Sequence, residues 1–323
     1  MSKQTEQAIR DMLDSAEEQG RCLYCNDHAT LAALRRRCQA GQIVEPHPRC
    51  FADSATWNAL DTQAQHLFLA RAIVRQRPDL VFNRQTAAVI WGLSVTRSSL
   101  ASIHASAQGT HHGSQGLLAL HHDAGHLEQT THIGLPVTTL SRTVFDCACH
   151  LPFGEGLAVA DAALRVGATT KDEMRSYAAG RSGARNIRRA RLVIEHANGL
   201  AANGGESVAR ATMLELGFEE PTLQLMIVDP MTKERRYVDF AWCRDDGTYV
   251  FGELDGKEKY LNPTMTGGRR AVDVLADERR RESRLTLAGA PICRFSYQEV
   301  LDRHYFERLL SQFDVPRGQP IKV

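Results

Sequence analysis

The stretch YVDFAWCRDDGTYVFGELDG, residues 237–256, decides the fold of the last third of this chain. Two runs rich in aromatic and β-branched residues flank a polar segment that ends in Asp-Gly-Thr, and this pattern predicts a β-hairpin. Successive side chains of a strand point to opposite faces of the sheet. Val238, Phe240 and Trp242 are therefore predicted to share one face of the first strand, while Asp239 points to the other.

The length of the hairpin loop sets which acids meet across the two strands. A two-residue loop would place Asp239 opposite Leu254. A three-residue loop with Gly247 in the left-handed conformation would instead place Asp239 opposite Glu253, with Asp255 on the same face. Like charges that face each other directly are destabilising. The second register is therefore understandable if a divalent cation lies among the carboxylates.

A fourth acid and a lysine complete the candidate site. Glu206 lies on the inward stripe of a predicted helix, residues 206–217, where a carboxylate is costly unless it is paired or bound to a metal. Lys257 and Lys259 follow the second strand of the hairpin directly. Hard oxygen ligands, a metal-activated water and a cation close to the phosphate together suit metal-dependent phosphodiester hydrolysis.

Each candidate residue has a predicted role. Asp239 and Glu253 are the expected direct ligands of Mg²⁺ or Mn²⁺, and Asp255 is expected to bind a second ion or to orient water. Glu206 approaches from the helix side, and Lys257 stabilises charge on the scissile phosphate. The predicted metal ligands are thus Asp239, Glu253 and Asp255.

Five blocks in the last third of the chain resemble a restriction-endonuclease-like domain related to the very-short-patch repair endonucleases. They are ES (206–207), VDFAW (238–242), ELDGKEKY (253–260), ADERRRESRLTLAG (276–289) and ICRFSY (292–297). The resemblance covers about residues 200–315 and implies a PD-(D/E)XK-type nuclease fold. That pattern requires a lysine where Asp255 stands, so either Lys257 or Lys259 substitutes for it or the site binds metal without cutting.

Two further segments resemble the AbiEi-like antitoxins of type IV toxin–antitoxin systems. They are VFNRQTAAVIWGL (81–93) and GLPVTTLSRTVFDCACHLP (134–152). The resemblance covers about residues 5–180. It implies a winged helix that binds promoter DNA, a small mixed domain after it, and possible pairing with a cognate toxin protein.

An arginine cluster is the candidate DNA contact of the N-terminal region. The predicted helix LAALRRRCQAGQ (31–42) precedes a proline-bearing segment, residues 43–53, which fits the wing of a winged helix-turn-helix. The candidate phosphate contacts are Arg35, Arg36, Arg37 and Arg49. A solvated helix face is the alternative interpretation of the arginine triplet. A second basic helix, residues 182–198, would either face DNA or link two domains.

Cysteines and histidines indicate no metal motif. Cys22 and Cys25 form one ligand pair, but a structural zinc site usually has two, and Cys38 lies on an apolar helix stripe. We therefore expect buried free thiols and no zinc. The histidines between residues 104 and 132 lack the spacing of a metal-binding helix, and their role is left open.

The composition narrows the classes of protein to which this chain can belong. The chain has 323 residues, of which 43% are hydrophobic, and its formal net charge is +1. The hydrophobic fraction is high enough for buried hydrophobic cores. Because the net charge is close to zero, nucleic-acid binding would have to come from local clusters of basic residues. No apolar run is long enough to cross a membrane, and the first twenty residues do not form a signal peptide. These features predict a cytoplasmic protein.

The predicted fold class is therefore α/β, in several domains. We expect a winged helix-turn-helix over residues 1–60, a mixed α+β domain over 61–198, and a restriction-endonuclease-like αβ sandwich over 199–323. The predicted function is DNA binding with Mg²⁺-dependent endonuclease potential, in phage defence, toxin–antitoxin biology or transcriptional regulation. The alternative is a non-catalytic repressor or antitoxin whose nuclease fold is degenerate.

Overall fold

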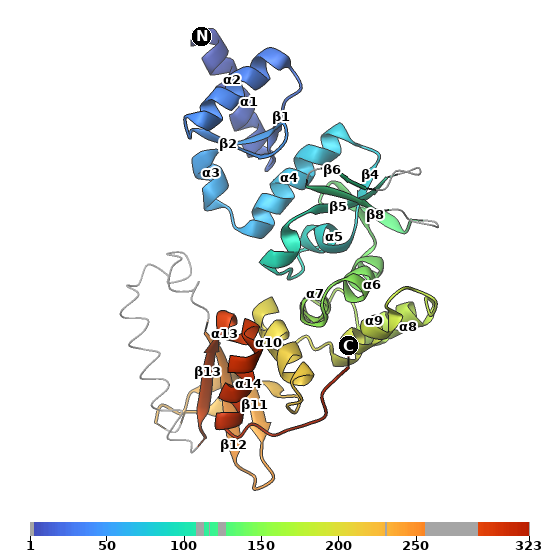
Figure 1. Ribbon diagram of the computed structural model, residues 1–323, viewed down its shortest axis with the longest axis vertical. Helices are drawn as coiled ribbons and strands as arrows, with labels where there is room; N and C mark the ends of the chain where they lie inside the picture. The colour runs from blue at the N-terminus through green and yellow to red at the C-terminus, as the bar shows by residue number, and fades with distance from the viewer. Residues whose placement is uncertain are drawn as a thin grey trace. The chain divides into compact units, whose positions relative to one another are not determined.

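The computed structural model describes residues 3–107, 113–115, 117–121, 127–229, 231–255 and 290–322. Its contacts divide the chain into two compact units, Met1–His150 and Leu151–Val323. Each unit combines helices with a sheet (Figure 1), so the predicted α/β multi-domain class is confirmed at this level. The contacts divide the chain at residue 150, whereas the domain boundaries predicted from the sequence lie at residues 60 and 198.

Three helices and a small antiparallel sheet open the first unit. Its elements are α1 (Lys3–Glu18), β1 (Leu23–Tyr24), α2 (His28–Gln39), β2 (Ile43–His47), β3 (Cys50–Asp53) and α3 (Ser54–Ala59). The strand order is β1-β3-β2, and Ile9, Leu34 and Phe51 are buried in the core beneath it. Residues 23–47 are all described, and only α2 lies between β1 and β2. A helix-turn-helix needs two consecutive helices, whereas β1 separates α1 from α2 and β2 follows α2. The winged helix-turn-helix is therefore not confirmed and stays a prediction.

A mixed six-stranded sheet forms the rest of the first unit, in the order β6-β7-β5-β4-β9-β8. Its strands are β4 (Leu80–Phe82), β5 (Ile103–Ala107), β6 (Gly113–Gln115), β7 (Leu118–His121), β8 (Gln129–His132) and β9 (Leu135–Thr138). The helices are α4 (Thr62–Gln76), α5 (Arg84–Ile90), the short 3₁₀ turn η1 (Arg97–Leu100) and α6 (Leu140–His150). Asn83 precedes α5, but its side chain makes no cap and donates to Ser106 Oγ (2.8 Å) instead.

Three helices precede the element that carries Glu206 in the second unit. They are α7 (Phe153–Arg165), α8 (Lys171–Ala179) and α9 (Ile187–His196), followed by α10 (Gly204–Glu215). The Thr-x-x-Glu sequence at the start of α8 forms a capping box, in which Thr170 and Glu173 exchange hydrogen bonds. Helix α10 packs against α7 as well as against the following sheet, so residue 198 does not separate two compact units.

A four-stranded sheet completes the second unit, in the order β10-β11-β12-β13. Its elements are β10 (Thr222–Val228), β11 (Arg235–Cys243), β12 (Tyr249–Asp255), β13 (Ile292–Ser296), α13 (Tyr297–Leu301) and α14 (Arg303–Gln312). The first two strand pairs are antiparallel and the last is parallel. Residues of α10 and α14, among them Met213 and Phe306, bury one side of the sheet with Phe240 and Phe295.

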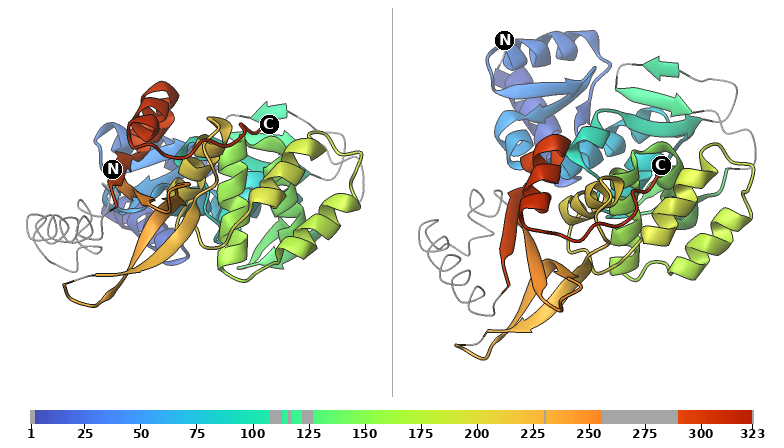
Figure 2. Two further views of the ribbon diagram at one scale, coloured as in Figure 1. Left: turned by 90° about the horizontal axis from the view of Figure 1, so that it is seen from below. Right: turned by 60° about the horizontal axis from the view of Figure 1, so that its bottom comes forward.

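The outer part of the β10–β11 hairpin projects from the remainder of this unit, as both views of Figure 2 show. Met226 pairs with Tyr237 there, and both are exposed. None of the helices in the described part of the chain is both long and apolar enough to cross a membrane.

Candidate nuclease site

Glu206 is buried at the start of α10, where it belongs to a reciprocal helix cap. The Asn203 side chain accepts a hydrogen bond from the Glu206 N–H (3.0 Å) and donates to Glu206 Oε1 (2.7 Å). The Ala202 N–H donates to Glu206 Oε2 (2.7 Å). A carboxylate in the first turn also suits the helix dipole. The predicted inward position of Glu206 is therefore correct, and the protein itself supplies donors that make its burial tolerable.

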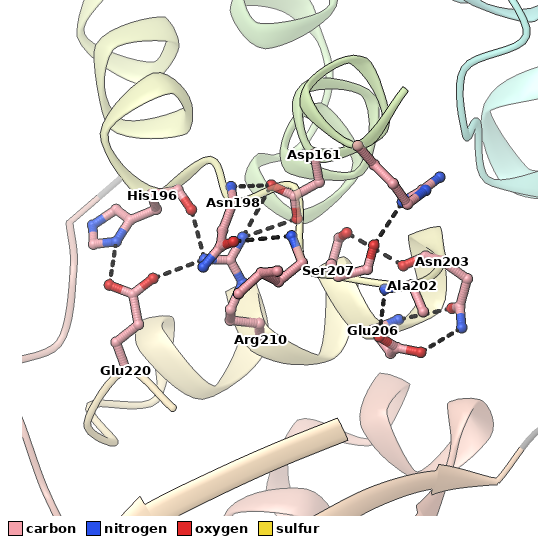
Figure 3. A network of polar contacts seen from close by, with 12 residues as sticks. Asp161, His196, Asn198, Ala202, Asn203, Glu206, Ser207, Arg210 and Glu220 are labelled. Atoms are coloured by element: carbon pink, nitrogen blue, oxygen red, sulfur yellow. Dashed lines mark hydrogen bonds and ion pairs between the residues drawn. The ribbon is translucent and has the colours of Figure 1, made fainter. Parts of the chain in front are cut away.

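A buried ion pair fixes α10 against the helices that precede it. Arg210, fully buried one turn after Glu206, donates through Nη2 to both oxygens of Asp161 on α7 (2.9 and 3.0 Å). Its Nη1 donates to the carbonyl of His196 at the end of α9 (2.5 Å) and to Glu220 (2.7 Å). Figure 3 shows this network beside the Glu206 cap. Because loss of either charge would strand the other in the interior, the network holds α10 in one position.

Burial and charge act in opposite directions within this network. Burial raises the pKa of Asp161, although the Arg210 charge and the hydrogen bond from the Asn198 N–H oppose the shift. Burial also acts to raise the pKa of Glu220, but the His196 hydrogen bond and the Arg210 charge outweigh it, so that pKa is lowered.

The predicted three-residue hairpin loop is confirmed. Arg244 and Thr248 close it through the Arg244 N–H and the Thr248 carbonyl (2.8 Å), and Gly247 has a φ of 81°. Phe240 pairs with Gly252 as the last pair of this ladder, and a continuation in the same register would place Asp239 opposite Glu253. The register on which the candidate site depends is thus the one present.

Strand alternation breaks at Asp239. The β10–β11 ladder pairs Leu223 with Phe240 and Leu225 with Val238, and Gln224 between them has a φ of 49°. Phe240 packs in the large core, whereas Val238 packs in a smaller cluster with Ala241 and Phe251. Val238 and Phe240 thus pack in different clusters beside the left-handed Gln224, whereas Phe240 and Trp242 share one. The predicted common face of Val238, Phe240 and Trp242 is therefore wrong for Val238.

Asp239 is held by donors from both adjacent strands. Its Oδ2 accepts from the Leu254 N–H (3.0 Å), and its Oδ1 accepts from Gln224 Nε2 (3.2 Å). The same Nε2 lies 3.5 Å from Glu206 Oε2. One amide group therefore lies between the helix acid and the first strand acid, and brings together two residues that are 33 positions apart in the sequence.

Glu253 and Asp255 share a positive partner from the parallel neighbour β13. Glu253 pairs with Arg294 in the ladder, and Arg294 Nη2 lies 2.8 Å from Glu253 Oε2. Arg294 Nη1 lies 3.7 Å from Asp255 Oδ1. A guanidinium thus offsets the repulsion that we expected a divalent cation to relieve.

The four acids consequently form two neighbouring pairs rather than a ready-made cage. Within the described residues, no set of three or more Asp, Glu, His or Cys side chains is arranged to hold a metal ion. Lys257 and Lys259, together with the blocks 256–260 and 276–289, lie outside the described residues. Asp239 and Glu206 on one side and Glu253 and Asp255 on the other are the groups that could supply oxygen ligands.

The N-terminal arginines differ from one another. The Arg35 side chain is 57% exposed and lies 3.4 Å from Glu45. Arg36 and Arg49 are exposed, and Arg49 Nη1 donates to Asn26 (2.6 Å). Arg37 is only 12% exposed, because it donates to the Ala33 carbonyl and lies 3.7 Å from Glu6. Arg37 is therefore the least accessible of the four candidate phosphate contacts.

Several thiols of the first unit lie in its apolar cores, and two of its histidines contact each other. Cys22 and Cys50 are fully buried in the core cluster that contains Leu80, and Cys25 packs in the neighbouring one. Burial raises the pKa of the Cys50 thiol to about 12. His104 Nδ1 and His121 Nε2 are 2.8 Å apart in a stacked pair. That these cysteines bind no zinc stays a prediction.

No protein-family model matches the chain, and no curated protein matches it either. The two resemblances seen in the sequence therefore remain predictions. Sequence reasoning missed Asn203, Gln224 and Arg294. The Asn-x-x-Glu spacing of 203–206 was a usable capping signal. Arg294 could be found only from the strand order, and no residue-type pattern marks Gln224.

Proposed function

We propose that this chain is a DNA-binding protein whose second unit carries a restriction-endonuclease-like site for a divalent cation. The observation that carries the proposal is the Gln224 amide, which lies between Glu206 and Asp239 beside the Glu253 strand. It brings a helix acid and a hairpin acid together in the predicted register. Carboxylates that come together from different elements are characteristic of functional sites.

Oxygen ligands of this kind suit Mg²⁺ or Mn²⁺, which would activate water for attack on a phosphodiester. The chain's own residues would orient the site. The Leu254 N–H and the Gln224 amide fix the Asp239 carboxylate, and the Asn203 cap fixes Glu206. Arg294 would carry the positive charge that Asp255 cannot provide at the lysine position of the predicted pattern.

One observation favours the non-catalytic alternative. Each of the four acids already has a donor or a cationic partner within the protein. Acids that already have hydrogen-bond donors or cationic partners need no metal ion, so a domain of this fold can bind DNA without binding a cation. The two candidates differ in cation binding and in cleavage, so both must be measured.

Thermal unfolding of the full chain with Mn²⁺ or with EDTA tests the cation site. Mn²⁺ at ten times a Kd of about 1 mM would stabilise the second unit by about 1.4 kcal/mol, a rise of roughly 2–5 °C in Tm. Asp239→Asn keeps the size of the side chain and removes its charge, so we expect this rise to disappear. Asp245→Asn, an exposed acid in the loop of the same hairpin, is the matched control and should keep it.

Cleavage of plasmid DNA by the same proteins separates the two candidates. A cation-dependent rise in Tm together with cleavage lost in Asp239→Asn supports the endonuclease. A rise in Tm without cleavage supports the non-catalytic DNA-binding protein. A wild-type Tm that is equal in Mn²⁺ and EDTA means that the acids form no cation site.

A further inference from the structure

An acid-free, arginine-rich stretch lies in the helical part of the second unit. Residues 176–194 contain five arginines, no lysine and no aspartate or glutamate. The whole chain, by contrast, has a net charge of only +1. Solvated protein surfaces ordinarily intersperse charges of both signs. This stretch is therefore a local positive surface in a chain that is otherwise nearly neutral.

Three of the five arginines face solvent without a partner in the described part of the chain: Arg185, Arg188 and Arg191. Ala190, Val193 and Ile194 are buried, so the helix turns its apolar side inward and Arg188 and Arg191 outward. Arg188 and Arg191 are one turn apart, and Arg185 lies just before the helix. We call these three residues the α9 arginine surface.

Neighbouring basic residues are already committed to contacts within the protein. The Arg181 guanidinium lies 3.8 Å from the centre of the Tyr177 ring. Arg189 donates to the Leu151 carbonyl (3.2 Å), and Arg175 pairs with Asp172 (3.1 Å) and Glu195 (3.2 Å). The α9 arginine surface thus differs from its surroundings in having positive charge available for an external partner.

Helix stability does not explain the placement of these arginines. They lie at and before the first turns of α9, where the helix dipole is positive and acids are favoured. The first turn has no acidic residue, and the N-cap residue Asn186 makes no side-chain cap. Arg188, in the first turn, therefore opposes the dipole instead of complementing it. A polyanion would reverse this cost, because the dipole and the guanidinium groups would then attract the same partner.

We propose that the α9 arginine surface binds the phosphate backbone of DNA. Guanidinium groups match phosphate oxygens in bidentate geometry, and no lysine is present in the stretch. The inference rests on the DNA binding proposed above and assigns it to a surface of the second unit. Of the two roles that the sequence leaves open for the basic helix 182–198, contact with DNA is thus favoured over a simple link between domains.

The surface is tied mechanically to the candidate nuclease site. The carbonyl of His196, at the end of α9, accepts from Arg210 on α10, one turn from Glu206. Arg188 precedes His196 by eight residues, roughly 12 Å along a helix. The α9 arginine surface therefore lies at the start of a helix whose end is fixed to α10 through Arg210.

Fluorescence anisotropy of the full chain with a labelled duplex of unbiased sequence, over a range of KCl concentrations, tests the proposal. The variant replaces Arg185, Arg188 and Arg191 with glutamine. We expect about tenfold weaker binding near 0.1 M salt and a salt slope that is shallower by up to about 2.7, or 0.9 for each lost contact. Because all three side chains are exposed and arginine at the start of α9 opposes the helix dipole, the Tm should not fall.

Two comparisons make the result specific. Arg175→Gln combined with Arg303→Gln and Arg308→Gln removes the same charge from other exposed positions of this unit and should leave the salt slope almost unchanged. Arg35→Ala with Arg36→Ala and Arg37→Ala tests the N-terminal helix separately. If the wild type binds and the α9 variant keeps its slope, the α9 surface is refuted while DNA binding stands. If the wild type binds no DNA, the proposed function fails, and this inference fails with it.

Discussion

A carboxylate removed from water needs a donor or a cation, and Glu253 has a cation within the protein. Arg294 lies 2.8 Å from Glu253 and 3.7 Å from Asp255, from a neighbouring parallel strand. A divalent cation that used Glu253 as a ligand would have to displace this guanidinium or share the carboxylate with it. The affinity of the site for metal should therefore depend on Arg294 as well as on the acids.

Replacement of Arg294 tests this competition. Arg294→Met leaves Glu253 and Asp255 without the guanidinium, so we expect the free energy of unfolding in EDTA to fall by about 2 kcal/mol. The rise in Tm on adding Mn²⁺ should exceed that of the wild type, because the cation then replaces the missing charge. Arg294→Lys keeps a positive charge and should lie between the two. An equal Mn²⁺ effect in all three proteins would show that arginine and metal do not compete.

At the scale of elements, short sequence patterns predicted the structures that depend on residues close together in the chain. The β11–β12 hairpin follows from its loop sequence, and the capping box of α8 follows from Thr170 and Glu173. Both depend on residues a few positions apart. The prediction that alternate side chains share a face, however, assumes a regular strand. It fails on either side of Asp239, where Val238 and Phe240 pack in different clusters beside the left-handed Gln224. The Glu253–Arg294 contact spans 41 residues, and only the strand order reveals it.

Helix α2 shows the same limit in the first unit. Its periodicity and its Asp27 cap are local, and the predicted helix is present. The sequence did not show which arginines of the triplet 35–37 are accessible to phosphate. Arg37 folds back onto the Ala33 carbonyl, while Arg35 reaches solvent. Whether a basic helical residue faces outward depends on partners, here Glu6, that lie far away along the chain.

The hairpin loop gives a prediction that isolates backbone conformation. Gly247 has a φ of 81°, and an added Cβ would meet no atom within 4 Å, so only the dihedral angle opposes a side chain. Gly247→Ala should lower the free energy of unfolding by about 1–2 kcal/mol, whereas Gly247→Asn should cost less, since asparagine tolerates the left-handed region. Urea unfolding at neutral pH measures both. Equal losses would mean that the loop changes conformation to accept either residue.

At the scale of the whole chain, two units with separate cores need not unfold together. Trp57 and Trp91 belong to the first unit and Trp242 to the second, so fluorescence of single-tryptophan variants can follow each unit separately. A single Tm is then defined only if the two transitions coincide. This separation matters for any pH study, because the buried histidines with displaced pKa values lie in the first unit.

Three histidines should make the first unit acid-sensitive. Burial lowers the pKa of His66 and of His104 to about 4, and burial with the nearby Arg84 charge lowers that of His121 to about 3. In the unfolded chain these groups titrate near 6.5. The unfolded state therefore binds more protons as pH falls below about 6.5, so stability is complete above this pH and declines below it.

We expect the Tm of the first unit, followed through Trp57 and Trp91, to fall steadily between pH 7 and pH 5, a window above most carboxylate titrations. His121→Gln removes the most strongly shifted group and the stacked partner of His104. It should lower the Tm at pH 7 but weaken its dependence on pH. His28→Gln, at an exposed histidine of the same unit, is the control and should leave the slope unchanged. A Tm that stays constant from pH 7 to pH 5 would show that these histidines remain accessible to protons in the folded state, and that the His104–His121 hydrogen bond does not depend on a neutral pair.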